Sequence, residues 1–321
     1  MPLEFEWSGV RSIVDGLHVE RGSTLTGEPV LLLTADTVEA QQVLRNEVTI
    51  GVQLTQTFPS FPPELSRLVG FNASDRPTLA VVTCAGEELS AERVRGLPST
   101  ALRAAAESLL DALTFLAEAR IAHRAITPRR LYWDGARLQL TGFGHAVRTL
   151  PPVRREPGPA APPWTAPEQL RGEGVVSTAD DLYGAAAVLF WMFTGETPGE
   201  AADMQGRIEL QSDDLRARLT GMFAEPAERR PALGEVRRRW RPPALPGPRP
   251  PAFEERDRDA EAAFAAMRRR QAIDDHLGLV SGPVFGAGQP RALNPDRRLR
   301  LVAAVVALAV ILTAVAALAG W

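Results

Sequence analysis

The chain has 321 residues, of which 45% are hydrophobic, and a formal net charge of −3. This length allows two domains or one domain of about 250 residues with additional segments, and the acidic balance gives no general case for nucleic-acid binding. The single cysteine, Cys84, excludes an internal disulfide. The sequence contains no lysine, so all 36 basic residues are arginine and any mechanism that needs a lysine side chain is excluded.

Residues 1–97 are predicted to form strands with a single helix. The first residues are acidic and aromatic, without the basic and apolar regions of a secretion signal. Residues 37–54 have apolar side chains at helical spacing, with Thr37 as the expected N-cap. Apolar and β-branched runs bounded by turn residues predict strands, which lie within 10–34, at 65–71 and at 79–84.

Residues 98–240 are predicted to be mainly helical. Four segments have the apolar spacing of helices, and they are 99–120 with Ser99 as its N-cap, 178–194, 215–223 and 233–240. An Asp134-Gly135 turn between two short apolar runs predicts a hairpin over residues 131–140. Residues 150–163 contain six prolines, which favour a stiff surface loop.

A linker is expected after this helical region. Residues 241–298 begin and end with Pro- and Gly-rich sequence, which is typical of segments between domains. A charged helix is expected near residues 253–277, where Ala260, Phe264 and Met267 recur at helical spacing. This helix either packs on the preceding domain or binds a partner, and the sequence leaves both possibilities open.

The C-terminal residues predict a membrane anchor. Residues 301–321 contain no charged side chain, and a helix of this length spans roughly 30 Å, the thickness of the bilayer core. We therefore predict a transmembrane helix at residues 299–321. Arg297, Arg298 and Arg300 precede the apolar run, so the positive-inside rule predicts a single-pass protein with a cytoplasmic N-terminal domain and essentially no external portion.

Five short motifs follow one another along the predicted C-terminal half of the domain. They are His123-Arg124-Ala125, Gly142-Phe143-Gly144, Pro163-Trp164-Thr165-Ala166-Pro167-Glu168, Asp181-Leu182-Tyr183 and Glu228-Arg229-Arg230-Pro231. In this order and spacing, residues 10–240 resemble the bacterial serine/threonine protein-kinase domain. The resemblance implies an α+β, bilobal fold, with a β-rich N-lobe and hinge over residues 1–97 and a helical C-lobe over residues 98–240.

The resemblance implies a framework role for the residues that match the family pattern. The catalytic loop of the family corresponds to the loop that begins with His123-Arg124-Ala125. Asp181 is expected to hold the backbone of this loop, and Glu168 is expected to pair with Arg230. His123 and Phe143 are expected in the apolar column that joins the lobes. The complete set of framework residues is Glu47, His123, Arg124, Phe143, Gly144, Glu168, Asp181 and Arg230.

The positions that carry phosphoryl transfer in the family hold other residues. The resemblance places these positions at Leu33 and Thr127 for two lysines, Ala125 for the general base, and Arg130 and Gly142 for the two metal ligands. No Gly-rich phosphate loop is recognisable in residues 15–22. Because transfer depends on positioning and charge neutralisation, we expect a pseudokinase that is not an enzyme, with no catalytic residues, no metal, no cofactor and no ATP binding.

The loop before the Ala166-Pro167-Glu168 motif is poor in sites for phosphorylation. Between Gly144 and Trp164, Thr149 is the only hydroxyl residue. The resemblance implies that Arg124 would bind a phosphorylated residue of this loop, and the loop offers few such residues. The prolines favour a surface that is held in shape and recognised by another protein. The residues predicted for this partner surface are Thr149, Pro151, Pro152, Pro157 and Pro159.

The leading hypothesis is a catalytically inactive, membrane-tethered scaffold or regulator of protein partners, which are themselves expected at the membrane. One alternative is an atypical ATP-dependent kinase or transferase with relocated catalytic residues. Another is a small-molecule sensor that uses the vacated nucleotide cleft, where Leu31, Leu33 and Val82 favour an apolar ligand.

Overall fold

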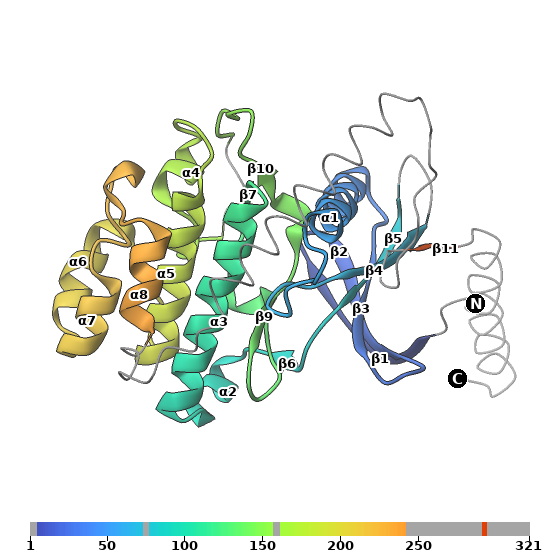
Figure 1. The fold of residues 1–321 in the computed structure, drawn as a ribbon, viewed down its shortest axis with the longest axis horizontal. Helices are drawn as coiled ribbons and strands as arrows, with labels where there is room; N and C mark the ends of the chain where they lie inside the picture. Colours follow the sequence, from blue (N-terminus) through green and yellow to red (C-terminus); the bar gives the residue numbers. More distant parts are fainter. Residues whose placement is uncertain (1–4, 73–76, 157–160, 242–290, 294–321) are drawn as a thin grey trace, which may run out of the picture. The chain divides into compact units, whose positions relative to one another are not determined.

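The structure is a computed structural model that describes residues 5–72, 77–156, 161–241 and 291–293 (Figure 1). These residues belong to one compact unit of the chain, and residues 242–289 lie outside the description. The predicted helix near 253–277 and the predicted transmembrane helix at 299–321 also lie outside the described residues. Within the described ranges, no helix has the length and apolar character needed to cross a membrane.

The N-terminal part is built on a six-stranded sheet in the order β1-β2-β3-β5-β4-β11 (Figure 1). Adjacent strands are antiparallel, except that β11 runs parallel to β4. One helix, α1 (Val38–Thr57), accompanies the sheet. The strand bounds are β1 Phe5–Val14, β2 Leu17–Thr24, β3 Pro29–Thr34, β4 Leu68–Asn72, β5 Leu79–Thr83 and β11 Arg291–Leu293.

Strand β3 is buried on both of its faces. Leu31 and Leu33 belong to an apolar cluster that contains Leu44 of α1, while Val30 and Leu32 belong to a second cluster on the other face. Successive side chains of a strand point to opposite faces, which explains why four consecutive apolar residues are buried here. A strand of this kind reads as a continuous apolar run in the sequence.

The C-terminal part is helical and centred on α5 (Thr178–Thr194), in which every residue from Asp180 to Met192 is buried. Helix α3 (Ser99–Glu118) buries its Leu109, Leu110 and Leu113 face in the same core. The other helices are α2 Ala91–Gly96, α4 Pro167–Arg171, α6 Ala201–Glu209, α7 Asp213–Leu219, α8 Leu233–Trp240 and the 3-10 helices η1 Pro128–Arg130, η2 Phe143–His145 and η3 Ala227–Arg229.

Two small sheets lie between these helices in the sequence. They are the three-stranded sheet of β6 (Glu87–Glu88), β8 (Leu131–Trp133) and β9 (Leu138–Leu140), and the pair of β7 (Ile121–Ala122) with β10 (Val147–Arg148). The predicted hairpin is confirmed as β8 and β9, and its turn is stabilised by Asp134 Oδ1, which accepts hydrogen bonds from the amides of Ala136 and Arg137.

Most other element predictions are confirmed, and three differ. Thr37 caps α1 by accepting a hydrogen bond from the Ala40 amide. Ser99 is the first residue of α3 and not its cap, because Pro98 takes the extended cap position. The helix predicted at 215–223 is α7 (Asp213–Leu219), which Ser212 caps. Strand β11 lies within the predicted linker, where three residues pair with β4 and add a strand to the edge of the sheet.

Candidate functional site

The loop that carries the His123-Arg124-Ala125 motif is held by one buried carboxylate. Asp181 Oδ2 accepts a hydrogen bond of 2.7 Å from the His123 amide, and Asp181 Oδ1 accepts one of 2.7 Å from the Arg124 amide. Burial raises the pKa of Asp181 to about 7, although these two amides oppose the increase. Asp181 lies in the first turn of α5, where the helix dipole favours a negative charge. The structure thus provides the contact that the resemblance implies.

His123 and Phe143 lie together behind this loop. Their rings meet edge to face with centroids 5.4 Å apart, and both residues are buried. The His123 Nε2 atom lies 3.1 Å from the Thr141 carbonyl oxygen. Burial lowers the pKa of His123 to about 4, so the ring is neutral at pH 7. It acts as a packing element here.

Asn46 of α1 connects the N-terminal part to this region, and sequence reasoning missed it. Its Nδ2 atom donates hydrogen bonds to the carbonyl oxygens of Phe143, Gly144 and Ala146, at 3.3, 3.1 and 2.8 Å. A single amide therefore fixes η2 against α1. The one feature of the sequence that could have drawn attention to Asn46 is its place next to Glu47, which the resemblance identifies as a framework residue.

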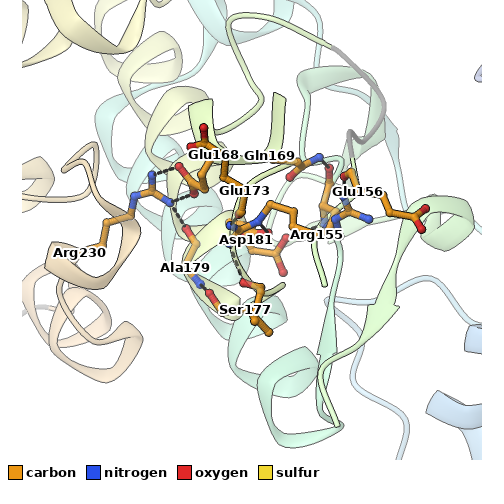
Figure 2. Close-up of polar contacts among 12 residues, drawn as sticks. Arg155, Glu156, Glu168, Gln169, Glu173, Ser177, Ala179, Asp181 and Arg230 are labelled. Carbon is orange, nitrogen blue, oxygen red and sulfur yellow. Dashed lines mark hydrogen bonds and ion pairs between the residues drawn. The ribbon is translucent and has the colours of Figure 1, made fainter. Parts of the chain in front are cut away.

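Glu168 and Arg230 form a buried, bidentate ion pair (Figure 2). Arg230 Nη1 donates to Glu168 Oε1 at 2.6 Å, and Arg230 Nη2 donates to Oε2 at 2.8 Å. Burial alone would raise the pKa of Glu168, but hydrogen bonding and the charge of Arg230 outweigh it, and the pKa is lowered. The same guanidinium donates to the Ala179 carbonyl oxygen, so the pair joins α4, η3 and the start of α5.

The segment from Val147 to Val176 is fixed by a second buried pair that sequence reasoning missed. Arg155 Nη2 donates to Asp180 Oδ1 at 2.7 Å and Arg155 Nε donates to Oδ2 at 3.1 Å, and both side chains are almost fully buried. Arg155 also donates to the carbonyl oxygens of Glu173 and Val175. Figure 2 shows Arg155 beside Glu173, near the start of α5. We call residues 147–176 the activation segment.

Backbone pairing and Arg124 complete this arrangement. The Arg155 amide donates a hydrogen bond to the Gly174 carbonyl oxygen, and the Val176 amide donates one to the Val153 carbonyl oxygen, each with an N···O distance of 2.9 Å. Arg124 Nη2 donates to the Glu156 carbonyl oxygen at 2.9 Å. Arg124 therefore binds the activation segment through a main-chain group.

The predicted partner-surface residues are only partly described. Pro151 and Pro152 are exposed, and Thr149 is half-buried with its amide bonded to the Arg120 carbonyl oxygen. Pro157 and Pro159 lie outside the described residues.

A small cavity lies between the sheet and the catalytic loop. It has a volume of about 40 Å³, whereas drug-sized ligand pockets have about 300–1,000 Å³. Among the predicted degenerate positions, Leu33, Arg130 and Gly142 line it, and Glu47 joins them. Ala125 and Thr127 do not line it. The rest of the lining is Val14, Asp15, Leu17, Val19, Leu31, Val43, Val82, Arg129, Tyr132, Thr141 and Gly144.

Glu47 is an unpartnered carboxyl group in the wall of this cavity. It is 1% exposed, and neither carboxyl oxygen has a hydrogen-bond partner among the described residues. Burial raises its pKa to about 8, while the nearby amides of Phe143 and Gly144 act in the opposite direction without reaching hydrogen-bonding geometry. Leu33 on β3 offers no charge to Glu47. The carboxyl group is therefore mostly neutral at pH 7.

Arg130 occupies the part of the cavity next to Gly142. Its Nη1 donates to the Gly142 carbonyl oxygen, and its Nη2 forms an ion pair with Asp15 from the β1–β2 turn. Arg130 is 5% exposed, and burial lowers its pKa to about 10, so it remains charged at pH 7. Gly142 has φ of 80°, and a Cβ atom added there would overlap the Arg130 guanidinium.

Comparison with known proteins assigns the family. The model of the protein kinase domain matches residues 34–235, more than half of the sequence, and the chain belongs to the protein kinase domain family. The sheet-rich N-terminal part and the helical C-terminal part fit the bilobal fold of that family.

Two protein kinases are similar to parts of this chain. CBL-interacting protein kinase 4 of Oryza sativa subsp. japonica is 31% identical over 110 residues, which cover 32% of this chain and 24% of the relative. Serine/threonine-protein kinase CHK1 of Saccharomyces cerevisiae is 29% identical over 157 residues, which cover 44% of this chain and 29% of the relative. The chain thus spans less than a third of the length of either relative.

The prediction that the chain is not an enzyme is wrong by these comparisons. The family and both relatives are protein kinases, and they point to a protein kinase enzyme at low identity. The inference from Leu33, Ala125 and Gly142 to an inactive protein is therefore not supported. Phosphoryl transfer depends on positioning and on neutralisation of phosphate charge. Arg130, which stands at a predicted metal-ligand position, places a positive charge in the cleft.

The residues at the two predicted metal-ligand positions, Arg130 and Gly142, do not fit the magnesium ion that the family implies. Magnesium prefers an octahedron of oxygen ligands that includes carboxylates. Here Gly142 has no side chain, and the neighbouring Arg130 is a cation that already holds the nearby Asp15 carboxylate. The described residues contain no group of three or more His, Cys, Asp or Glu side chains that could bind a metal ion.

Replacement of Arg230 by Met is expected to destabilise the domain strongly, because it leaves the Glu168 carboxylate buried without its partner. Breaking such a pair from one side costs about 3–5 kcal/mol. Urea unfolding followed by tryptophan fluorescence measures the free energy of unfolding. The matched control is Arg171→Met, which breaks only exposed ion pairs to Glu173 and Glu225 and should cost under about 1 kcal/mol. Equal losses in the two variants would contradict the assigned role of Arg230.

Glu47 is expected to make folding stability fall with rising pH. A carboxyl group with a folded pKa near 8 favours folding fully below its unfolded pKa of about 4.5, and that contribution is lost as the pH rises through 8. Between pH 5 and 8.5, the native chain should lose about 2–4 kcal/mol more stability than the Glu47→Gln variant. Urea unfolding at both pH values measures this difference. Glu39→Gln, an exposed change on the same helix, should follow the native chain, and parallel pH profiles for all three proteins would refute the effect.

Proposed function

We propose that this member of the protein kinase domain family regulates or scaffolds a protein partner, which it binds through its activation segment. The observation that carries the proposal is a set of exposed aliphatic residues on a segment whose described residues are fixed by the Arg155–Asp180 ion pair. Of the eight large hydrophobic residues that are exposed in the described part of the chain, four lie in or beside this segment. They are Leu150, Val153, Leu170 and Val175, and we call them the apolar surface.

The members of the apolar surface come from one stretch of the chain, part of which is paired with itself. The backbone of Arg154 bridges that of Val175, so Val153 and Val175 lie on neighbouring extended segments. Leu170 belongs to α4, which is linked to Glu173 by the hydrogen bond from the Glu173 amide to the Glu168 carbonyl oxygen. Exposed apolar side chains that recur along one segment of a folded domain favour an interaction site there.

The buried pairs behind the apolar surface support binding as its use. Arg155 and Asp180 fix the segment from inside, so the exposed face is ordered before any partner arrives. A pre-ordered surface loses less conformational entropy on association, which favours affinity. Thr149 is the single hydroxyl residue between Gly144 and Trp164, so this stretch offers one position for phosphorylation.

Membrane attachment is part of the proposal and rests on the sequence alone. The uncharged residues 301–321, preceded by Arg297, Arg298 and Arg300, support a cytoplasmic domain tethered by a single helix at 299–321. Confinement to the membrane raises the effective concentration of partners at that surface. A membrane-associated protein partner is therefore the expected class, and the proposal includes no nucleic acid.

The apolar surface can be tested by site-specific photo-crosslinking of the full-length chain in native membranes. A photoreactive residue at position 153 should crosslink a defined protein partner, and one at position 210 should not, although Leu210 is 85% exposed. The double change Val153→Glu and Val175→Glu should reduce capture of that partner about tenfold or more, because it places charges in an apolar contact. Leu210→Glu is the matched control. Equal capture by both variants, or equal crosslinking at both positions, would refute the proposal.

The second candidate function is ATP-dependent phosphoryl transfer with relocated charged groups. Two observations favour it, namely membership of the protein kinase domain family and the buried cation of Arg130 in the cleft. The chain matches less than a third of either relative named above. Kinase activity like that of these relatives is therefore proposed for this chain.

This candidate predicts that ATP stabilises the full-length chain. A ligand at about 100 times its Kd adds about 2.7 kcal/mol to stability, which corresponds to a rise in Tm of roughly 5–10 °C for a domain of this size. Thermal unfolding with and without millimolar ATP, in magnesium and in EDTA, measures the shift, and transfer of labelled phosphate to the chain or to a general acceptor protein measures activity. Absence of both a shift and transfer would eliminate this candidate.

A further inference from the structure

Arg130 is a buried cation with an internal ligand. Its side chain is 6% exposed, and its guanidinium is shared between the Gly142 carbonyl oxygen and the Asp15 carboxylate. Arginine presents a planar fork of donors that matches the two oxygens of a carboxylate or phosphate. Within this domain, Asp15 takes the place of such an anion.

Asp15 is poised to leave this contact. Asp15 and Gly16 form the two-residue turn between β1 and β2, and both have positive φ, 52° and 77°, as in the tight turns that favour Asp-Gly. The Asp15 side chain is 28% exposed. By contrast, the carboxylates that hold Arg155 and Arg230 are 0% and 8% exposed and belong to the packed C-terminal part. Of these three partners, Asp15 is the one that solvent and solutes can reach.

Two further polar groups beside Asp15 and Arg130 have unmet hydrogen-bonding capacity. Both carboxyl oxygens of Glu47, which lines the same cavity, have no partner among the described residues. His145 Nε2 also has no hydrogen bond there and lies 3.5 Å from Asp15 Oδ2, a loose contact. Buried polar groups without partners are rare in native proteins and call for an explanation. Glu47 lines the cavity that an anion bound to Arg130 would occupy, and His145 lies beside the Asp15 carboxylate that such an anion would replace.

We propose that the cleft binds a small oxyanion, a carboxylate or a phosphate monoester attached to a compact apolar group, on Arg130 in place of Asp15. The apolar walls of Leu31, Leu33 and Val82 receive the body of the ligand. Arg130 supplies the positive charge, so binding requires no metal ion. The inference stands on the cleft alone and does not rest on the apolar surface of the activation segment.

The chemistry of Glu47 supports this site. Burial raises its pKa to about 8, so at pH 7 the carboxyl group is mostly protonated and acts as a hydrogen-bond donor. A neutral donor near Arg130 adds to the attraction for an oxyanion, whereas an ionised carboxylate would oppose it. The small cavity of about 40 Å³ requires that the β1–β2 turn lifts on binding. Ligand binding and release of Asp15 are therefore coupled.

The test removes the internal ligand. In the full-length chain, Asp15→Asn keeps the shape of the side chain and removes its charge, so the fraction of molecules with a free Arg130 rises. The apparent Kd is inversely proportional to that fraction, so we expect binding at least about tenfold tighter than in the native chain. Isothermal titration in EDTA with butanoate and, separately, with methyl phosphate distinguishes the carboxylate from the phosphate source. Sodium chloride at equal ionic strength controls for salt.

Loss of Arg130 completes the test. Arg130→Ala should abolish binding of both anions, and Arg130→Gln, which keeps polar contacts without the charge, serves if the alanine variant does not fold. Arg137→Ala, an exposed arginine in the β8–β9 turn, should bind like the native chain. The site is refuted if neither anion binds the Asp15→Asn chain, if binding survives the loss of Arg130, or if binding requires magnesium. Partner crosslinking at position 153 is unaffected by Asp15→Asn, so failure here is distinguishable from failure of the partner-binding proposal.

Discussion

The carboxylate of Asp181 is the contact on which the arrangement of the site depends. It is buried in the first turn of α5 and accepts both the His123 and the Arg124 amides at 2.7 Å. These two bonds fix the loop that leads, through η1, to Arg130 and the cleft. Because α5 itself is buried along almost its whole length, the position of the loop is set by the core of the helical part. A surface contact would leave it free to shift.

The adjacent Asp180 fixes the activation segment in the way that Asp181 fixes the loop. Asp181 holds the catalytic loop, and Asp180 holds the activation segment through Arg155. Glu168 and Arg230 then join α4 and η3 to the start of α5. Removing charges from water is costly, so such pairs add more to the choice of one conformation than to net stability. One turn of helix thus sets the positions of the loop and of the segment that faces outward.

Much of the fold could be predicted from local sequence patterns. The bounds of α5 and α8 follow from apolar spacing, and the β8–β9 hairpin follows from its Asp-Gly turn. The contacts between distant residues could not be predicted in this way. Asn46 meets Phe143, Arg155 meets Asp180, and Asp15 meets Arg130 across long stretches of chain. Neither an arginine nor an asparagine carries a local sign of its partner, so only the folded arrangement identifies these pairs.

Gly142 and Arg130 have become dependent on each other. Gly142 adopts a left-handed backbone conformation that disfavours other residues, and a Cβ atom there would meet an arginine that Asp15 and the Gly142 carbonyl oxygen already hold in place. An aspartate placed at position 142 alone would therefore enter an occupied volume. Changing Arg130 alone would leave Asp15 without its cation. Positions 130 and 142 are therefore expected to be epistatic, so that the residue tolerated at one position depends on the residue at the other.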